Sequence, residues 1–549
     1  MSESSRAFVK GATILALTGI TARVIGAVFR IVLAAILGDE GIGLYMYAYP
    51  VYSTLLVVST AGIPVALSKL MAENIALKDY REALRVFRVA LFILTLSGLA
   101  ITMVLLLGAE FFAASIVKDM EAVYPLMAIS PAIFFVTIMA ALRGFFQGQQ
   151  NMIPTAASQL LEQLVRVGFS IFLVLLLLPV GLEFAAAGAT SGAAAGGLGG
   201  LVFLSIFYWR KRGRFMSLAD QQEKHEPAPV SRIIGRIFSL AVPVTIGGLV
   251  IPLISLIDLA VVPRQLQAAG FDLETARALY GQLTGMAGPI VYFPNVVALA
   301  LSISLVPAIS EAFALKDRLL IQSRTAVAVK LTVFFALPSA LGLYLLAEPI
   351  TVLLYDNAAA GYSLAYMSWS VIPLCLYVTT TGLLQGLGRP IVPALNMIYG
   401  GAVKTLFAWY LTAVPELNVG GAALASVIGI GVAAALNLYH VSRFTGWRGN
   451  FREVLLLPGL SVVAMSIIVY GAYGGIARYG EPFLSAGRLN AAAVLLAIIA
   501  GILVYSLVLF LTGGLSREEL NMVPLIGPRL AALARRFRKM QGPNGVDNQ

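Results

Sequence analysis

Long apolar runs, separated by short polar stretches, recur along the whole of this 549-residue chain. A run of roughly 20 apolar residues lets a helix cross the hydrocarbon core of a bilayer. The pattern therefore predicts an all-α polytopic membrane protein with fourteen transmembrane helices, of which the eighth is interrupted by Pro289 and Pro294. The predicted spans are 10–37, 43–68, 88–109, 122–142, 153–178, 184–209, 234–262, 282–306, 325–347, 362–386, 391–413, 418–440, 454–474 and 489–512.

Basic residues gather in every second connection between the predicted spans. With the N-terminus placed inside, the inner connections and the two ends of the chain hold 29 of the 38 Lys and Arg residues, and the outer connections hold 5. Because Lys and Arg accumulate in cytoplasmic segments, this count predicts that both termini are cytoplasmic. Four basic residues remain, and all lie within predicted spans: Arg23, Arg30, Arg166 and Lys404.

The composition argues against several classes of protein. Hydrophobic residues make up 59% of the chain and charged residues 12%, so the net charge of +11 reflects membrane topology rather than nucleic-acid binding. The single cysteine, Cys375, excludes an intramolecular disulfide, and His225 and His440 form no cluster with metal-ligand spacing. The sequence also has no glycine-rich phosphate loop followed by lysine. We therefore expect no cofactor, no metal, no nucleic-acid partner and no catalytic residues.

Two halves of six predicted spans resemble each other. Gly148 and Arg166 recur 238 residues later as Gly386 and Lys404, and each glycine follows a glutamine. Because six is an even number, both halves begin on the same side of the membrane. The repeat is then a parallel one, related by an axis along the membrane normal, and a site is expected between the two lobes.

The chain therefore divides into five predicted parts. Within the first lobe, the span 184–209 carries a glycine at every fourth residue from Gly188 to Gly200, which favours close packing of a neighbouring helix. The tail combines leucines with a cluster of arginines and is typical of a helix lying on anionic lipid. The parts are an N-terminal lobe (1–209), a polar cytoplasmic linker (210–232), a C-terminal lobe (233–445), a thirteenth and fourteenth span (446–513) and a cytoplasmic, amphipathic, basic tail (514–549).

The charged residues within the spans are the candidate site. An unpaired charge in hydrocarbon is costly, so such residues usually face a protein interior or a wet cavity. Four cations stand against two carboxylates there, and the excess of positive charge suits a phosphate or pyrophosphate. The alternative is that the charges are ion pairs that hold the lobes together. We predict that the substrate is bound by Arg23, Arg30, Arg166 and Lys404, and that the charge is balanced or gated by Glu162 and Asp258.

Two stretches carry a resemblance to a known family. The stretch 143–155, RGFFQGQQNMIPT, and the stretch 23–26, RVIG, are similar to the polysaccharide-exporter branch of the multidrug/oligosaccharidyl-lipid/polysaccharide (MOP) flippase superfamily. Within that branch the chain most resembles the stage V sporulation protein B group, which is related to the MurJ-type lipid II flippases. The resemblance implies a V-shaped pair of lobes around a cationic cavity, with a groove for the lipid tail at the last two helices. Arg23 matches the MurJ pattern, whereas Arg30 lies one residue beyond it and is rotated by about 100°.

The resemblance implies a flippase of the cytoplasmic membrane that works by alternating access. Its substrate would be an undecaprenyl-pyrophosphate-linked cell-wall precursor, with lipid II as the first candidate, and an ion gradient or the membrane potential would reset it. Expected partners are the lipid-linked anionic sugar precursor, membrane lipids and the cell-wall synthesis machinery. The alternatives are an exporter of another lipid-linked oligosaccharide or polysaccharide unit, a membrane scaffold for cell-wall or spore-cortex assembly, and an enzyme that acts on the same lipids.

Overall fold

The computed structural model describes residues 3–221, 229–449, 452–479 and 485–512. Every regular element in these ranges is helical, which confirms the predicted all-α class. The predicted tail (514–549) and residues 222–228 of the predicted linker lie outside the described residues. The remainder of the linker is largely helical, because α6 continues to Asp220 and α7 begins at Val230.

The helices of the first part of the chain are long, and short helical turns connect some of them. They are α1 (Glu3–Thr60), α2 (Ile63–Ala76), α3 (Tyr80–Phe111), η1 (Phe112–Val117), η2 (Met120–Ala122), α4 (Val123–Gly148), α5 (Ile153–Leu177), α6 (Leu182–Asp220) and α7 (Val230–Ala268).

The second part contains several shorter elements. They are α8 (Leu273–Gly281), the π-helical turn η3 (Gln282–Ala287), α9 (Gly288–Tyr292), α10 (Asn295–Ala314), α11 (Arg318–Leu345), α12 (Ala347–Tyr355), α13 (Ala360–Ser368), α14 (Val371–Gly386), α15 (Ile391–Leu411), α16 (Asn418–Thr445), η4 (Arg452–Leu456), α17 (Leu457–Tyr479) and α18 (Ala486–Leu511).

The described residues contain 12 helical segments that are long and apolar enough to cross a membrane, or up to 13 if the bent pair α13–α14 is one span. This number is below the predicted fourteen because Leu17–Ala76 counts as one segment, although α1 is kinked at Gly38, which has φ 70°. The eighth predicted span, 282–306, is displaced along the chain. The spanning helix there is α10, which begins at Asn295 because Pro294 has no N–H to continue the preceding turn.

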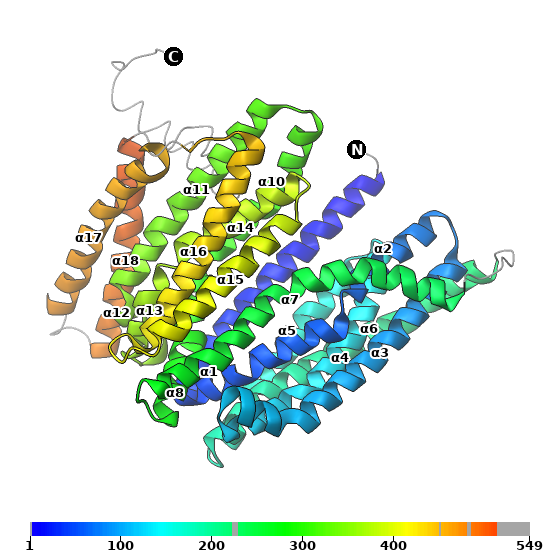
Figure 1. The fold of residues 1–549 in the computed structure, drawn as a ribbon, viewed down its shortest axis with the longest axis horizontal. Coiled ribbons are helices and arrows are strands. Elements are labelled where there is room, and N and C mark those ends of the chain that lie inside the picture. Colours follow the sequence, from blue (N-terminus) through cyan, green and yellow to red (C-terminus); the bar gives the residue numbers. More distant parts are fainter. Residues whose placement is uncertain (1–2, 222–228, 450–451, 480–484, 513–549) are drawn as a thin grey trace.

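Figure 1 shows α2–α6 grouped on one side and α10–α16 on the other, with α17 and α18 beyond them and α1 and α7 between the two groups. Helices of both groups contribute to one large core, in which the rings of Tyr47 on α1 and Tyr280 on α8 are 5.3 Å apart. At the opposite ends of the helices the cores are separate. One, around Phe87, belongs to α2–α4, α6 and the start of α7, and the other, around Leu383, belongs to α10, α11, α14 and α16. The two groups are therefore joined at the end that contains α8 and apart at the end that contains α2.

Glycines allow close packing against the helices that carry two of the candidate cations, Arg166 and Lys404. A Cβ at Gly196 of α6 would lie 2.6 Å from the backbone oxygen of Glu162 and 3.0 Å from the Cβ of Arg166 on α5. In the second group, a Cβ at Gly429 of α16 would collide with Lys404 of α15. The glycine-bearing helix thus fixes the position of the helix that carries each cation.

Gly196→Ala should lower the stability of the protein by about 1–3 kcal/mol, since the added methyl group overpacks the contact between α5 and α6. The measurement is the thermal unfolding midpoint of the purified protein in detergent. Gly168→Ala on α5 is the matched control, because a Cβ there meets nothing within 4 Å. Equal unfolding midpoints for the Gly196→Ala and Gly168→Ala proteins would show that α5 and α6 are not closely packed at Gly196.

Candidate functional site

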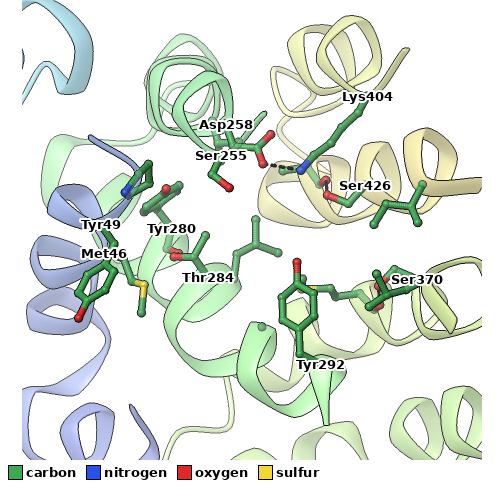
Figure 2. A pocket seen from close by; sticks show the side chains of 18 of the residues that line it. Met46, Tyr49, Ser255, Asp258, Tyr280, Thr284, Tyr292, Ser370, Lys404 and Ser426 are labelled. Carbon is green, nitrogen blue, oxygen red and sulfur yellow. Dashed lines mark hydrogen bonds and ion pairs between the residues drawn. The ribbon is translucent and has the colours of Figure 1, made fainter. Parts of the chain in front are cut away.

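A cavity of about 320 Å³ lies where α1, α7, the η3–α9 segment and α13–α16 meet. Its lining includes charged side chains from three different helices, Arg30 of α1, Asp258 of α7 and Lys404 of α15. Figure 2 shows Asp258 and Lys404 facing each other along one edge of the cavity, with Tyr49 and Tyr292 at other edges. Two of the four predicted substrate-binding cations are thus brought together, with one of the two predicted carboxylates.

Two interrupted helices contribute much of the cavity wall. Thr284 and Tyr292 belong to the segment that Pro289 and Pro294 interrupt, and Ser370 lies at the break between α13 and α14, which are inclined at 47°. Irregular backbone at membrane depth is tolerated where it lines a cavity, and proline-interrupted spans often mark a transport site. The prolines were visible in the sequence and could have located this wall of the site.

Lys404 and Asp258 form an ion pair across the interface between α15 and α7. The Lys404 ammonium donates a hydrogen bond to Oδ2 of Asp258, and their side chains are 14% and 21% exposed. The pair brings no net charge to the cavity. An ammonium group has three N–H donors, so Lys404 can still donate to an incoming anion, and that anion competes with Asp258 for the charge of Lys404.

Arg30 is the uncompensated cation of the cavity. Its guanidinium carbon lies 5.9 Å from the centroid of the Tyr49 ring, a cation–π contact, and no carboxylate of the described residues pairs with it. A cation–π contact leaves the N–H groups of the guanidinium available for a bidentate anion. The positive charge of the cavity therefore comes from Arg30.

Arg166 and Glu162 form a separate cluster that the sequence revealed only in part. Glu162 accepts hydrogen bonds from Arg166 at 3.2 Å and from Arg143 at 2.9 Å, and Arg143 also donates to Ser158 at 3.0 Å. Arg143 lies one residue beyond the predicted span 122–142, but α4 continues to Gly148 and leaves its side chain only 17% exposed. The cluster has two cations and one carboxylate, so its net charge is positive.

A row of tyrosines lies between this cluster and the cavity. The ring centroids of Tyr45 and Tyr49 are 4.9 Å apart, and those of Tyr49 and Tyr52 are 6.0 Å apart. Tyr49 lines the cavity, and both Tyr49 and Tyr52 lie within electrostatic reach of Arg166. The Nε atom of Arg166 is buried and has no hydrogen-bond partner among the described residues. Arg166 itself does not line the cavity, although Tyr49 beside it does.

Arg23 lies outside both groups of residues. It is exposed on α1, seven residues before Arg30, on the part of the helix that leads toward the end where the two helix groups are apart. The sequence alone therefore did not separate the cations that line the cavity from those that lie beside it or before it.

Comparisons with known proteins agree with this fold. Residues 8–313 match a family model described as polysaccharide biosynthesis protein. Stage V sporulation protein B of Bacillus subtilis (strain 168) is 30% identical over 525 residues, which cover 95% of this chain and 99% of that protein. Lipid II flippase MurJ of the same organism is 26% identical over 510 residues, which cover 89% and 92% of the two chains. A solved structure of lipid II flippase MurJ in an inward closed conformation has the same fold, with 16% identity, a TM-score of 0.62 and coverage of 90% and 98%.

Glu162→Gln should destabilise the protein by about 3–5 kcal/mol, because it leaves two largely buried arginines without their shared carboxylate. The measurement is again the thermal unfolding midpoint in detergent. Glu311→Gln is the control, since the Glu311 side chain is 65% exposed and its ion pair with Arg324 is worth little. A midpoint for Glu162→Gln as high as that of the control would show that the arginines find other partners.

Proposed function

Because this chain belongs to the polysaccharide biosynthesis protein family, within the MOP superfamily of flippases and related transporters, we propose that it moves an undecaprenyl-pyrophosphate-linked cell-wall precursor from the inner to the outer leaflet of the cytoplasmic membrane. The first candidate is lipid II, since a lipid II flippase is among its relatives. The chain is a transporter rather than an enzyme. An ion gradient or the membrane potential resets it between cycles, and no cofactor takes part.

The observation that carries this proposal is the charge of the cavity. Arg30 offers a guanidinium fork that matches the oxygens of a pyrophosphate, and Lys404 offers a point charge on another wall. When a phosphate oxygen replaces Asp258 on Lys404, the contact between α7 and α15 is broken. Substrate binding then favours the conformation in which α7 and α15 are not in contact. The shift in population is set by the difference between the affinities of the two conformations for the substrate.

The remaining predicted site residues act around the cavity. Arg23 receives the pyrophosphate first, about two helical turns before Arg30 along α1. Arg166 adds positive potential behind the tyrosines, and Glu162 holds it in place through the ion pair at 3.2 Å. Asp258 occupies Lys404 between cycles and so gates the site.

The helices support fourteen spans in two lobes. A straight helix of the 60 residues from Leu17 to Ala76 would be about 90 Å long, three times the thickness of the hydrocarbon core, so the segment crosses twice with Gly38 between the crossings. With α13–α14 as one span, the count is fourteen. The lobes correspond at their helix junctions, since Gly148 lies against Met71 of α2 and Gly386 lies against Ile309 of α10. The count of basic residues in the connections supports a cytoplasmic location for both termini.

An ion cluster around the buried Arg277 closes the outer end of the molecule. Arg277 of α8, with 2% of its side chain exposed, donates to Asp119 at 2.8 and 3.0 Å and to Glu40 at 2.8 Å, and also pairs with Glu121 at 2.6 Å. Burial disfavours the charged guanidinium, but the hydrogen bonds and charge of Asp119 raise the pKa of Arg277 above its usual range. Arg277 therefore stays charged, and the cluster joins the two lobes until they separate.

Beside this cluster, Asp39 at the kink of α1 accepts hydrogen bonds from Gln282 at 2.8 Å and from Asn357 at 3.0 Å. These contacts also join the first lobe to the second. Release of substrate to the outer leaflet requires both sets of contacts to open, which is the conformational step of alternating access.

Arg30→Gln should weaken binding of an undecaprenyl-pyrophosphate-linked sugar by about ten- to a hundredfold, the effect expected for loss of a charged hydrogen-bonding partner. Native mass spectrometry of the purified protein measures which lipid is bound and how tightly. Arg30 is a cleaner target than Lys404, whose removal would leave Asp258 unpaired.

The control for this experiment is Lys69→Gln, since the Lys69 side chain is 58% exposed and does not line the cavity. Binding of neutral phospholipids alone by the unmodified protein would contradict the proposal. Binding of a different pyrophosphate-linked oligosaccharide in preference to lipid II would support the proposed mechanism but show that lipid II is not the substrate.

Joining the lobes at their outer end should stop transport. Asp39→Cys and Gln282→Cys in a Cys375→Ser background place two thiols where side chains are hydrogen-bonded, and a short bis-methanethiosulfonate should link them through two disulfide bonds. Transport into the outer leaflet of reconstituted vesicles should then cease and return when the link is reduced, whereas each single-cysteine protein should be insensitive. Continued transport by the fully linked protein would rule out opening at this end.

A further inference from the structure

Hydroxyl groups surround the cavity on several walls. Each of five serine and threonine hydroxyls donates its proton to a backbone carbonyl three or four residues earlier, at distances of 2.6–3.2 Å. A hydroxyl has one proton and two lone pairs, so each of these groups can still accept a hydrogen bond from a ligand. They are Ser53, Ser255, Thr284, Ser370 and Ser426.

Aromatic rings also line the cavity, and one of them is open to a ligand. Tyr292 is 50% exposed at the end of α9, where the helix is interrupted before Pro294. Figure 2 shows its hydroxyl directed into the cavity, toward the side where Lys404 lies. Tyr280, by contrast, is 2% exposed and belongs to the core that joins the two lobes. Tyr292 therefore presents both a ring face and a hydroxyl to the cavity.

These groups suit a different part of the ligand from the cations. Ionised phosphate oxygens are acceptors only, so they bind Arg30 and Lys404 but gain nothing from hydroxyls that have already donated their protons. A sugar ring carries several hydroxyl donors, and its C–H face can pack on an aromatic ring. A cavity with two cations, five acceptor hydroxyls and an accessible tyrosine therefore matches a sugar attached to a phosphate.

We propose that this cavity recognises the first sugar of the substrate as well as its pyrophosphate, with Tyr292 as the platform for the sugar ring and the five hydroxyls as acceptors for its hydroxyl groups. This inference rests on the proposed function and adds to it. The cavity volume of about 320 Å³ lies at the lower end of the range for ligand sites. The cavity therefore holds the sugar next to the phosphate, and the distal part of the head group lies outside it.

The test compares two ligands, undecaprenyl pyrophosphate and the same lipid carrying one N-acetylated hexose. The protein should bind the glycosylated lipid more tightly. Tyr292→Leu should weaken binding of the glycosylated lipid by about three- to tenfold, the factor expected for one aromatic contact, and leave binding of the sugar-free lipid unchanged. Tyr292→Phe, which keeps the ring, should retain most of the affinity. Titrations in nanodiscs, read by native mass spectrometry, measure all of these constants.

Tyr470→Leu on α17 is the matched control, because Tyr470 is 76% exposed and does not line the cavity. The inference is overturned if the unmodified protein binds the two lipids equally, or if Tyr292→Leu weakens both to the same extent. Either result would leave the proposed function standing, since Arg30 would still bind the pyrophosphate. Failure of the unmodified protein to bind either lipid would overturn both proposals.

Discussion

A charge placed at membrane depth needs a partner, and this requirement organises the molecule. Lys404 forms an ion pair with Asp258, and Arg166 and Arg143 both pair with Glu162. Desolvation would otherwise make each of these side chains costly, so the helices that carry them are held in a definite register. Among the cations that line the cavity, only Arg30 has no carboxylate partner in the described residues, and the cavity is basic for that reason. On the proposed function, an anionic substrate supplies the partner that Arg30 lacks.

Helix α7 links the ion pair of the cavity to the contacts that join the two lobes. Near its start, Arg236 pairs with Glu73 of α2 at 2.8 Å, so this part belongs with the first lobe. Further along, Ile254 lies against Gly401 of α15 and Asp258 pairs with Lys404, so the same helix also contacts the second lobe. On the proposed function, a substrate that displaces Asp258 acts on a helix that contacts both lobes. In the proposed transport cycle, the shared core and the cluster of Arg277 are the contacts that open next.

The sequence predicted the helices better than the contacts between them. Apolar runs and flanking glycines and prolines placed three spans at 153–178, 391–413 and 418–440, close to the observed α5, α15 and α16. The pairing of Glu162 with Arg166 was predictable because the two residues are one helical turn apart. Arg277 and Asp119 are 158 residues apart in the sequence, and no local sequence pattern predicts such a pair. Arg143 follows the predicted span 122–142 directly, and only the observed length of α4 shows that it faces Glu162. Pro289 and Pro294 predict an interruption of the eighth span. The sequence does not show that this interrupted segment forms one wall of the cavity.

The proposed function of this protein is to move a pyrophosphate-linked sugar lipid across the membrane. The most direct measurement reconstitutes the purified protein in vesicles with lipid II or a shorter undecaprenyl-pyrophosphate-linked sugar, and follows the appearance of the sugar on the opposite leaflet with an impermeant enzyme or lectin. The proposed transport predicts that the fraction of accessible sugar rises above that of protein-free vesicles with time and with the amount of protein. Vesicles that contain the Arg30→Gln protein should stay near the protein-free level. An equal fraction of accessible sugar in vesicles with and without the unmodified protein, for both lipids, with an ion gradient or a membrane potential imposed, would contradict it.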